Sequence, residues 1–280
     1  MIDLHTHSTC SDGTDPPARV VELAAASGCR AVALTDHDTF AGLPRARARA
    51  AALGITLVPG CEVSCAYRGG SAHVLVYFAE DEASPLADEL AALRADRVDR
   101  NRQLARRLGE LGLDVTYEEI VTEAAGEESA GRPHVAAILV RHGYADSIPD
   151  AFDRWLGRGA PAYVSKARLD PPTLAAAARR SGAVAVLAHP LTLDLDAEGL
   201  DRAVGELAAA GFAGIEAHYA RYAPETRREL AALAERHGLV ATGGSDYHGE
   251  VKAGLTIGTG EGDLAVPDAV LDALVARRPS

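Results

Sequence analysis

Several features are scarce in this sequence, and each scarcity excludes a class of protein. The four cysteines include no C-x-x-C pair, so neither a disulfide framework nor a thiolate zinc site is indicated. No apolar run approaches the ~18 residues of a membrane-spanning helix, and no secretory leader is recognisable. Basic residues number 28 against 40 acidic ones, and this net charge of -12 disfavours binding to duplex DNA. We therefore expect a cytoplasmic protein without membrane contact that holds any anionic substrate at a local cationic site.

What the sequence does contain is an alternation of short apolar runs with alanine-rich helical stretches. Over the first 80 residues the order is βαβαββ, and the alternation of strand and helix returns after residue 170. Strands separated by helices of this length pair in parallel with crossovers of one hand. A chain of 280 residues is long enough for one βα barrel or one open sheet.

Residues 84–163 interrupt this alternation and are predicted to be helical. Four helices are expected there, over residues 86–111, 117–125, 133–142 and 149–156. The sequence thus predicts a discontinuous barrel domain, formed by 1–83 and 164–280, and a helical insertion, 84–163, that caps its active site.

Histidines and carboxylates gather where the expected strands end. His5 and His7 lie two residues apart on the first strand, so their side chains share a face and can bind one ion. Because parallel strands bring their carboxyl ends to one rim of a barrel, residues distant in sequence converge there. A mixture of imidazoles and carboxylates without thiolates suits Zn, Mn or Fe, and more than four ligands imply more than one ion.

Four motifs make the chain resemble the PHP family, named for its polymerase and histidinol phosphatase members. They are IDLHTHS, ALTDHD, the pair GCEVS and SAHVLVY, and GSDYH, in this order along nearly the whole chain. GRPH in the insertion, the later AHP and the strand IEAHY are similar to the nucleotide-phosphatase and exoribonuclease-like branch. The resemblance implies a distorted (β/α)7 barrel of PHP type with a helical insertion, a trinuclear metal centre and phosphoester hydrolysis.

The same resemblance implies the ligands of two to three divalent ions, Mn, Zn or Fe. The implied ligands of the first ion are His5, His7, Glu62 and Asp246. Those of the second are Glu62, His73 and His134, and those of the third are Asp12, His37 and His248. Two ions sharing Glu62 would lie roughly 3.5–4 Å apart, close enough for one hydroxide to bridge them and attack phosphorus. Asp3 and Asp36 are interpreted as carboxylates that orient imidazoles or end strands without touching an ion.

Four residues are predicted to contact the substrate. His189 ends a strand and is not needed as a ligand, so it is a candidate phosphate contact or general acid. Pro133 suits the first turn of a helix, whose free N–H groups form an anion site together with the Arg132 guanidinium. Lys166 and Arg168, on the return into the barrel, are candidates for a second phosphate.

The expected reaction removes the 3'-phosphate of a nucleoside 3',5'-bisphosphate and gives a nucleoside 5'-monophosphate. The substrate would be a small nucleotide or, in the first alternative, short RNA degraded by a 5'-3' exoribonuclease. A cyclic phosphoribose phosphodiesterase and a histidinol-phosphate phosphatase are further alternatives. A non-catalytic metal-binding module is disfavoured because all ligand positions are filled, and a metal amidohydrolase because His73 stands where that family needs Lys or a carboxylate. The role of His218 and the oligomeric state stay open.

Overall fold

The structure is a computed structural model that describes residues 1–79, 84–124, 130–165 and 169–279. It divides into two compact units, each described by itself. The first unit combines Met1–Leu90 with Arg168–Ser280, and the second is Ala91–Ala167. The boundaries predicted from the sequence lie a few residues before these.

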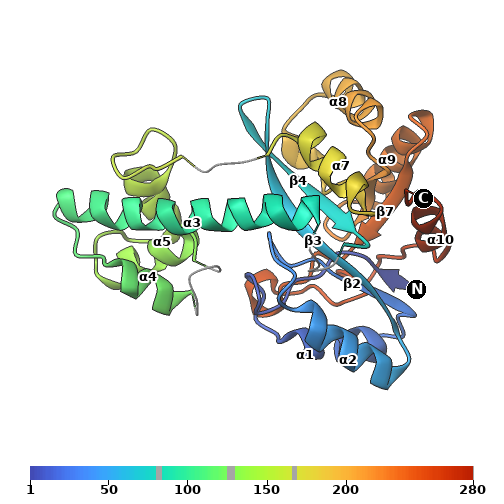
Figure 1. Ribbon diagram of the computed structural model, residues 1–280, viewed down its shortest axis with the longest axis horizontal. Helices are drawn as coiled ribbons and strands as arrows, with labels where there is room; N and C mark the ends of the chain where they lie inside the picture. Colours follow the sequence, from blue (N-terminus) through green and yellow to red (C-terminus); the bar gives the residue numbers. More distant parts are fainter. Residues whose placement is uncertain (80–83, 125–129, 166–168, 280) are drawn as a thin grey trace. The chain divides into compact units, whose positions relative to one another are not determined.

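The first unit is built around a seven-stranded sheet in which every strand neighbours the next along the chain (Figure 1). The strands are β1 (Ile2–Asp3), β2 (Ala31–Leu34), β3 (Thr56–Tyr67), β4 (Gly70–Tyr77), β5 (Val184–Leu187), β6 (Gly214–Tyr219) and β7 (Val240–Gly244). The sheet curls so that its two edges meet, because Leu4 N donates to the Gly243 carbonyl oxygen at 3.1 Å and Thr6 forms a parallel bridge with Tyr247. The predicted distorted α/β barrel is confirmed.

The strand pairing departs from the expected parallel order at β4. This strand runs antiparallel to both β3 and β5, whereas the other neighbours pair in parallel. Only Arg68 and Gly69 connect β3 with β4, and their φ angles are 45° and 81°. A two-residue loop with two positive φ angles is a hairpin turn of the type that joins antiparallel strands. The expected parallel pairing of strands joined through helices is therefore wrong for β4 and β5.

Helices of the first unit follow the strands that they connect. They are α1 (Pro17–Ala26), α2 (Leu43–Leu53), α7 (Pro171–Arg180), α8 (Ala197–Ala209), α9 (Pro224–Arg236) and α10 (Ala269–Val275). Helix α8 is an example of how these helices begin. The Asp196 side chain caps its first turn by accepting a hydrogen bond from Gly199 N. The same helix buries Leu200, Val204 and Leu207, which recur at helical spacing. Inside the barrel, Ile2, Leu4, Leu75, Tyr77 and Val186 are among the fully buried side chains.

The second unit consists of helices with a core of their own. They are the greater part of α3 (Pro85–Glu110), then α4 (Tyr117–Glu123), α5 (Arg132–Arg141), α6 (Ile148–Ala151) and the π-helical turn η1 (Phe152–Leu156). Leu108, Ile120 and Leu139 are buried at its centre. The last predicted helix is thus divided into α6 and η1, and the predicted end of the second one, residue 125, lies outside the described residues. Every helix in the described ranges is too short or too polar to cross a membrane.

Candidate metal centre

The barrel places its histidines and carboxylates at one rim. His5 and His7 follow β1, His37 follows β2, and Asp246 and His248 follow β7. These are the loops after the carboxyl ends of parallel strands, where barrel enzymes hold their catalytic groups. The sequence prediction that these five side chains meet agrees with the contacts described below.

The sequence suggested that Glu62 lies at the end of a strand. In the structure it lies in the middle of β3 and still reaches the same rim. Strand β3 pairs with β2 only through Thr56–Pro59 and continues alongside β4. Beyond that point Glu62 forms an isolated parallel bridge with His37. The long β3–β4 hairpin therefore carries Glu62 past the end of β2 and up to the cluster.

Glu62 is the carboxylate on which the imidazoles converge. Its side chain is only 1% exposed. The Oε1 atom lies 3.0 Å from His73 Nδ1 and 3.1 Å from His189 Nε2. The Oε2 atom faces three other ring nitrogens, those of His7 at 3.2 Å, His37 at 3.3 Å and His5 at 3.4 Å. The two oxygens of one carboxylate thus point to two different groups of histidines.

Three groups of side chains could each hold a metal ion. In each group, ligand atoms lie within 4.8 Å of one another. The groups are His5, His7 and Asp246; Glu62, His73 and His189; and His7, Asp12, His37 and His248. Eight of the nine ligands predicted from the sequence are present in these groups, and His189 is an addition.

Unsatisfied polar atoms show that the donor set fits divalent ions. The Nδ1 atoms of His7 and His37 are buried without a hydrogen-bond partner. His5 Nε2 and His7 Nε2 approach to 3.1 Å, and the rings of His7 and His248 stack at 4.1 Å between centroids. Buried ring nitrogens without a hydrogen bond are costly unless something binds them, and an ion coordinated by imidazole and carboxylate groups would do so.

The pKa values of His7, Glu62 and Asp246 favour the forms that bind metals. Burial by itself would lower the pKa of His5, but the carboxylates of Glu216, Asp246 and Glu62 outweigh it and raise that pKa. Burial, followed by the neighbouring imidazoles of His248 and His37, lowers the pKa of His7 to about 3. Burial by itself would raise the pKa of Glu62 and of Asp246, but the histidines around each carboxylate outweigh it and both pKa values are lowered. Carboxylates that stay ionised beside a neutral imidazole are ready to coordinate a cation.

Glu216, which the sequence left without a definite role, contacts two of the candidate ligands. It is fully buried, and its Oε1 lies 2.8 Å from His5 Nδ1. Its Oε2 accepts a hydrogen bond from the His189 backbone N–H at 2.8 Å. A carboxylate that binds the second nitrogen of an imidazole directs the first one towards the ion. His218 lies outside the three groups, beyond a register shift in β6 that separates it from Glu216.

Asp246 is held in place by two residues that sequence reasoning missed. Its Oδ2 accepts a hydrogen bond from the Tyr219 hydroxyl at 2.8 Å and forms an ion pair with Lys252 Nζ. The other oxygen, Oδ1, lies 3.4 Å from His5 Nε2 and 3.5 Å from His7 Nε2. Tyr219 ends the IEAHY motif, so its place in that motif was the available signal.

Asp3 and Asp36 act on backbone and loops rather than on imidazole rings. Asp36 accepts hydrogen bonds from Ser8 N at 2.7 Å and from the Ser11 hydroxyl at 2.8 Å, in the loop that leads to Asp12. Asp3 accepts from Ser245 N at 2.9 Å, next to Asp246. The sequence interpretation that neither is a ligand agrees with these contacts.

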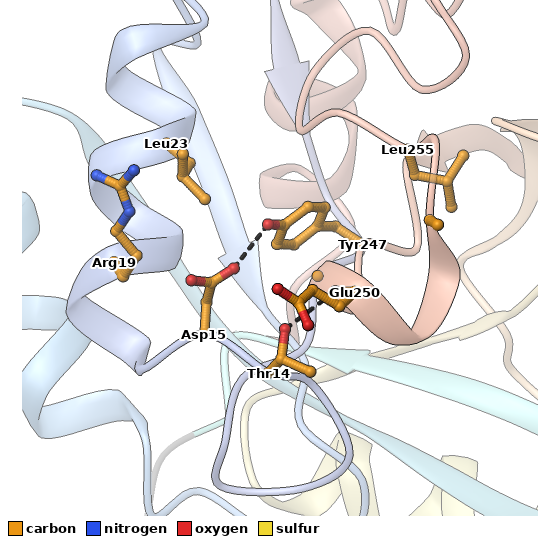
Figure 2. A pocket seen from close by; sticks show the side chains of 9 residues that line it. Thr14, Asp15, Arg19, Leu23, Tyr247, Glu250 and Leu255 are labelled. Carbon is orange, nitrogen blue, oxygen red and sulfur yellow. Dashed lines mark hydrogen bonds between the residues drawn. The ribbon is translucent and has the colours of Figure 1, made fainter.

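Two hydrogen bonds connect the loop that carries Asp12 with the loop that carries His248. The Tyr247 hydroxyl donates to Asp15 Oδ2 at 2.7 Å (Figure 2). Thr14 N donates to the His248 carbonyl oxygen at 3.2 Å. Thr14, Asp15 and Tyr247 line a cavity of about 600 Å³ beside the loops. We call the Tyr247–Asp15 hydrogen bond the loop clasp.

The remaining predicted site residues belong to other parts of the chain. Arg132 and His134 lie at the start of α5 in the second unit. There the Arg132 guanidinium donates to the Leu156 carbonyl oxygen at 3.3 Å, and His134 Nδ1 accepts from Gly131 N at 3.2 Å. Lys166 and Arg168 lie outside the described residues.

A distorted α/β barrel with three groups of candidate metal ligands at its rim is typical of a metal-dependent hydrolase, and this is the class of protein. Within that class, the chain belongs to the PHP domain family, whose sequence pattern matches residues 3–272. The family predicted from the four motifs is confirmed.

Three relatives have names that describe an activity. The chain is 34% identical to the 3',5'-nucleoside bisphosphate phosphatase of Chromobacterium violaceum, over 92% of this chain and 90% of the relative. It is 34% identical to the 5'-3' exoribonuclease Rnm of Escherichia coli, over 89% and 85%. It is also 34% identical to the phosphoribosyl 1,2-cyclic phosphate 1,2-diphosphodiesterase of Eggerthella lenta, over 89% and 94%. All three names describe cleavage of phosphate esters, which confirms the predicted class of enzyme.

Two solved structures share the fold over the whole chain. One, described as a candidate metal-dependent phosphoesterase from Bifidobacterium adolescentis, has a TM-score of 0.82 at 29% identity and is covered over 96% of its length. The other, described as an amidohydrolase from Chromobacterium violaceum with bound sulfate and no metal, has a TM-score of 0.80 at 32% identity and is covered over 98%.

Proposed function

We propose that the protein is a metal-dependent phosphohydrolase that removes the 3'-phosphate of nucleoside 3',5'-bisphosphates. The observation that carries this proposal is the geometry of Glu62, whose two oxygens face two separate groups of imidazoles. One carboxylate shared in this way suits a pair of adjacent ions. The phosphatase from Chromobacterium violaceum, similar over nearly the full length of both chains, supports the choice of substrate.

The proposed centre holds two to three divalent ions, Mn, Zn or Fe. The first would be bound by His5, His7, Glu62 and Asp246, and the third by Asp12, His37 and His248, as the sequence implied. For the second, Glu62 and His73 are joined by His189 in this proposal, because His189 Nε2 lies 3.1 Å from Glu62 Oε1. His189 Nδ1 contacts the Thr192 hydroxyl at 3.0 Å, which leaves Nε2 directed at the ion.

Divalent ions bound at such a centre lower the pKa of coordinated water and neutralise charge on phosphate oxygens. The protein's own residues supply the positioning. Glu216 orients the His5 imidazole, while Tyr219 and Lys252 hold Asp246 with its free oxygen towards His5 and His7. Groups held before the substrate arrives cost no reorganisation during the reaction.

Substrate contacts outside the barrel stay predictions. Arg132 is proposed to bind a phosphate group through its planar guanidinium, which matches phosphate geometry. Lys166 and Arg168 are proposed for a second phosphate. The capping of the active site by the helical unit is likewise a prediction.

A hydrolysis panel tests the proposed function. The protein loaded with Mn or Zn would be assayed with adenosine 3',5'-bisphosphate, short 5'-phosphorylated RNA, a cyclic phosphoribose and histidinol phosphate. We expect kcat/KM to be highest for the bisphosphate, with 5'-AMP and phosphate as products. The chelator-treated protein is the control, and equal rates with and without chelator would refute metal dependence.

The exoribonuclease activity is the second candidate because the Escherichia coli relative carries that name. A 3',5'-bisphosphate resembles the phosphorylated end of an RNA chain, so both substrates can meet the same metal centre. A higher kcat/KM on the RNA than on the bisphosphate would favour this candidate over the phosphatase.

A further inference from the structure

A second cavity, of about 810 Å³, lies at the opposite end of the barrel strands from the metal centre. Its lining includes Val184, the first residue of β5, and Ala213, which immediately precedes β6. His189 follows the other end of β5, and an extended segment from Val184 to His189 is roughly 15 Å long. A ligand in this cavity would therefore be separate from the substrate. We call it the basal cavity.

Four arginines surround the basal cavity in a protein whose net charge is -12. Arg179 and Arg180 lie in the last turn of α7, and Arg277 and Arg278 follow α10. Among the described residues that line the cavity there is no Asp or Glu. Arg179 and Arg180 also form no ion pair with any described residue. Favourable contact with the α7 dipole explains cations in its last turn. The helix dipole does not explain why a second pair of arginines, Arg277 and Arg278, lines the same cavity from another segment.

The two arginines after α10 are exposed, and each donates a hydrogen bond to a backbone carbonyl oxygen. Arg277 Nη2 donates to the Gly238 carbonyl oxygen at 2.7 Å, and Arg278 Nε donates to the Gly182 carbonyl oxygen at 3.3 Å. The Arg278 guanidinium also lies 5.0 Å from the centre of the Phe78 ring. Each guanidinium has five N–H donors, so these contacts leave donors available.

We propose that the basal cavity binds a polyphosphate anion. Guanidinium groups match phosphate oxygens in geometry, and four of them can offset the three or four charges of a triphosphate. The floor contributed by Ala183, Ala185 and Ala208 is apolar and built from small side chains, which leaves room for a ribose or base. The cavity volume falls in the range of small-molecule sites. Inorganic polyphosphates and nucleoside triphosphates share this chemistry, and the experiment distinguishes them.

The test measures binding to the metal-free full-length protein in a chelator, so that the metal centre is not loaded. Inorganic tripolyphosphate and ATP would be titrated into wild type and into the double variant Arg179→Ser/Arg180→Ser by calorimetry. The matched control is Arg202→Ser/Arg228→Ser, which removes the same charge from exposed positions on α8 and α9. We expect Kd to rise at least tenfold in the first variant and less than twofold in the control.

The two ligands identify the source of the phosphates. An affinity for ATP at least fivefold above that for tripolyphosphate would show that the nucleoside uses the apolar floor, whereas equal affinities would assign the site to the phosphate chain alone. The proposal is overturned when neither ligand binds wild type at about 1 mM, or when both double variants bind like wild type. Because hydrolysis is not measured, this outcome does not depend on the proposed enzymatic function.

Discussion

Single side chains decide which metal sites can form at this rim. Glu62 contacts ring nitrogens on both of its oxygens, and His189 completes the group that also contains His73. Both contacts can be removed by substitutions of similar size, which separates the loss of a ligand from the loss of packing.

For Glu62→Gln we expect the loss of about two ions per chain and a fall in kcat of at least ~10³-fold, because a neutral amide cannot bridge two cations. Metal content by elemental analysis and steady-state kinetics would measure both effects. Glu206→Gln is the control, since Glu206 is exposed and pairs with the surface residue Arg68. Near-normal metal content in Glu62→Gln would contradict the shared role.

His189→Gln and His134→Gln discriminate between the two assignments of the second site. We expect His189→Gln to lose one ion per chain, because its Nε2 lies beside Glu62 Oε1. If His189 takes the place of His134 as a ligand, His134→Gln should keep all of its metal. The reverse pattern would restore the ligand set that the sequence implied and return His189 to a role towards the substrate.

At the scale of elements, two loops and one hairpin set the geometry of the centre. The β3–β4 hairpin carries Glu62 and His73, and the loops after β1 and β7 carry Asp12 and His248. Asp12 is 45% exposed. The loop clasp between Tyr247 and Asp15 is one of the contacts that hold the two loops together, beside the hydrogen bond from Thr14 N to the His248 carbonyl oxygen.

Tyr247→Phe should weaken the third site alone. The variant keeps the ring and removes the 2.7 Å hydrogen bond to Asp15, so we expect about one ion per chain to bind 10- to 100-fold more weakly. The free energy of unfolding should change by only about 1 kcal/mol. Metal titration followed by elemental analysis checks the first effect. Tyr67→Phe, which removes an exposed contact with Glu206, should leave metal binding unchanged.

At the scale of the whole molecule, the buried His7 imidazole couples the stability of the metal-free protein to pH. The folded-state pKa of His7 is about 3, below its ordinary value near 6.5, because the ring is buried beside other imidazoles. Between these values the unfolded chain binds a proton at His7 and the folded chain does not. The contribution of His7 to stability is therefore lost as pH falls through this window.

From pH 7 to pH 5, this linkage amounts to about 2 kcal/mol. Denaturant unfolding of the metal-free protein at several pH values would show it, and His7→Gln should flatten the slope by that amount. An identical slope in wild type and His7→Gln would disprove the linkage.

The amino-acid sequence alone determined the family, the barrel and most of the candidate ligands. Motifs such as IDLHTHS and GSDYH place histidines and carboxylates at strand ends, and the rule that parallel strands end at one rim brings them together. These inferences need only local patterns and chain order, so they could be made without coordinates.

Only the tertiary structure decided which of these side chains share a site. His189 and Glu62 are separated by 127 positions, and their 3.1 Å contact depends on the antiparallel β4 between β3 and β5. Glu216, Tyr219 and Lys252 hold ligands through contacts across the barrel. The basal cavity likewise needs α7 and the segment after α10 side by side. Sequence patterns report which face a residue lies on, whereas such distances arise only when the sheet has closed and its side chains have packed.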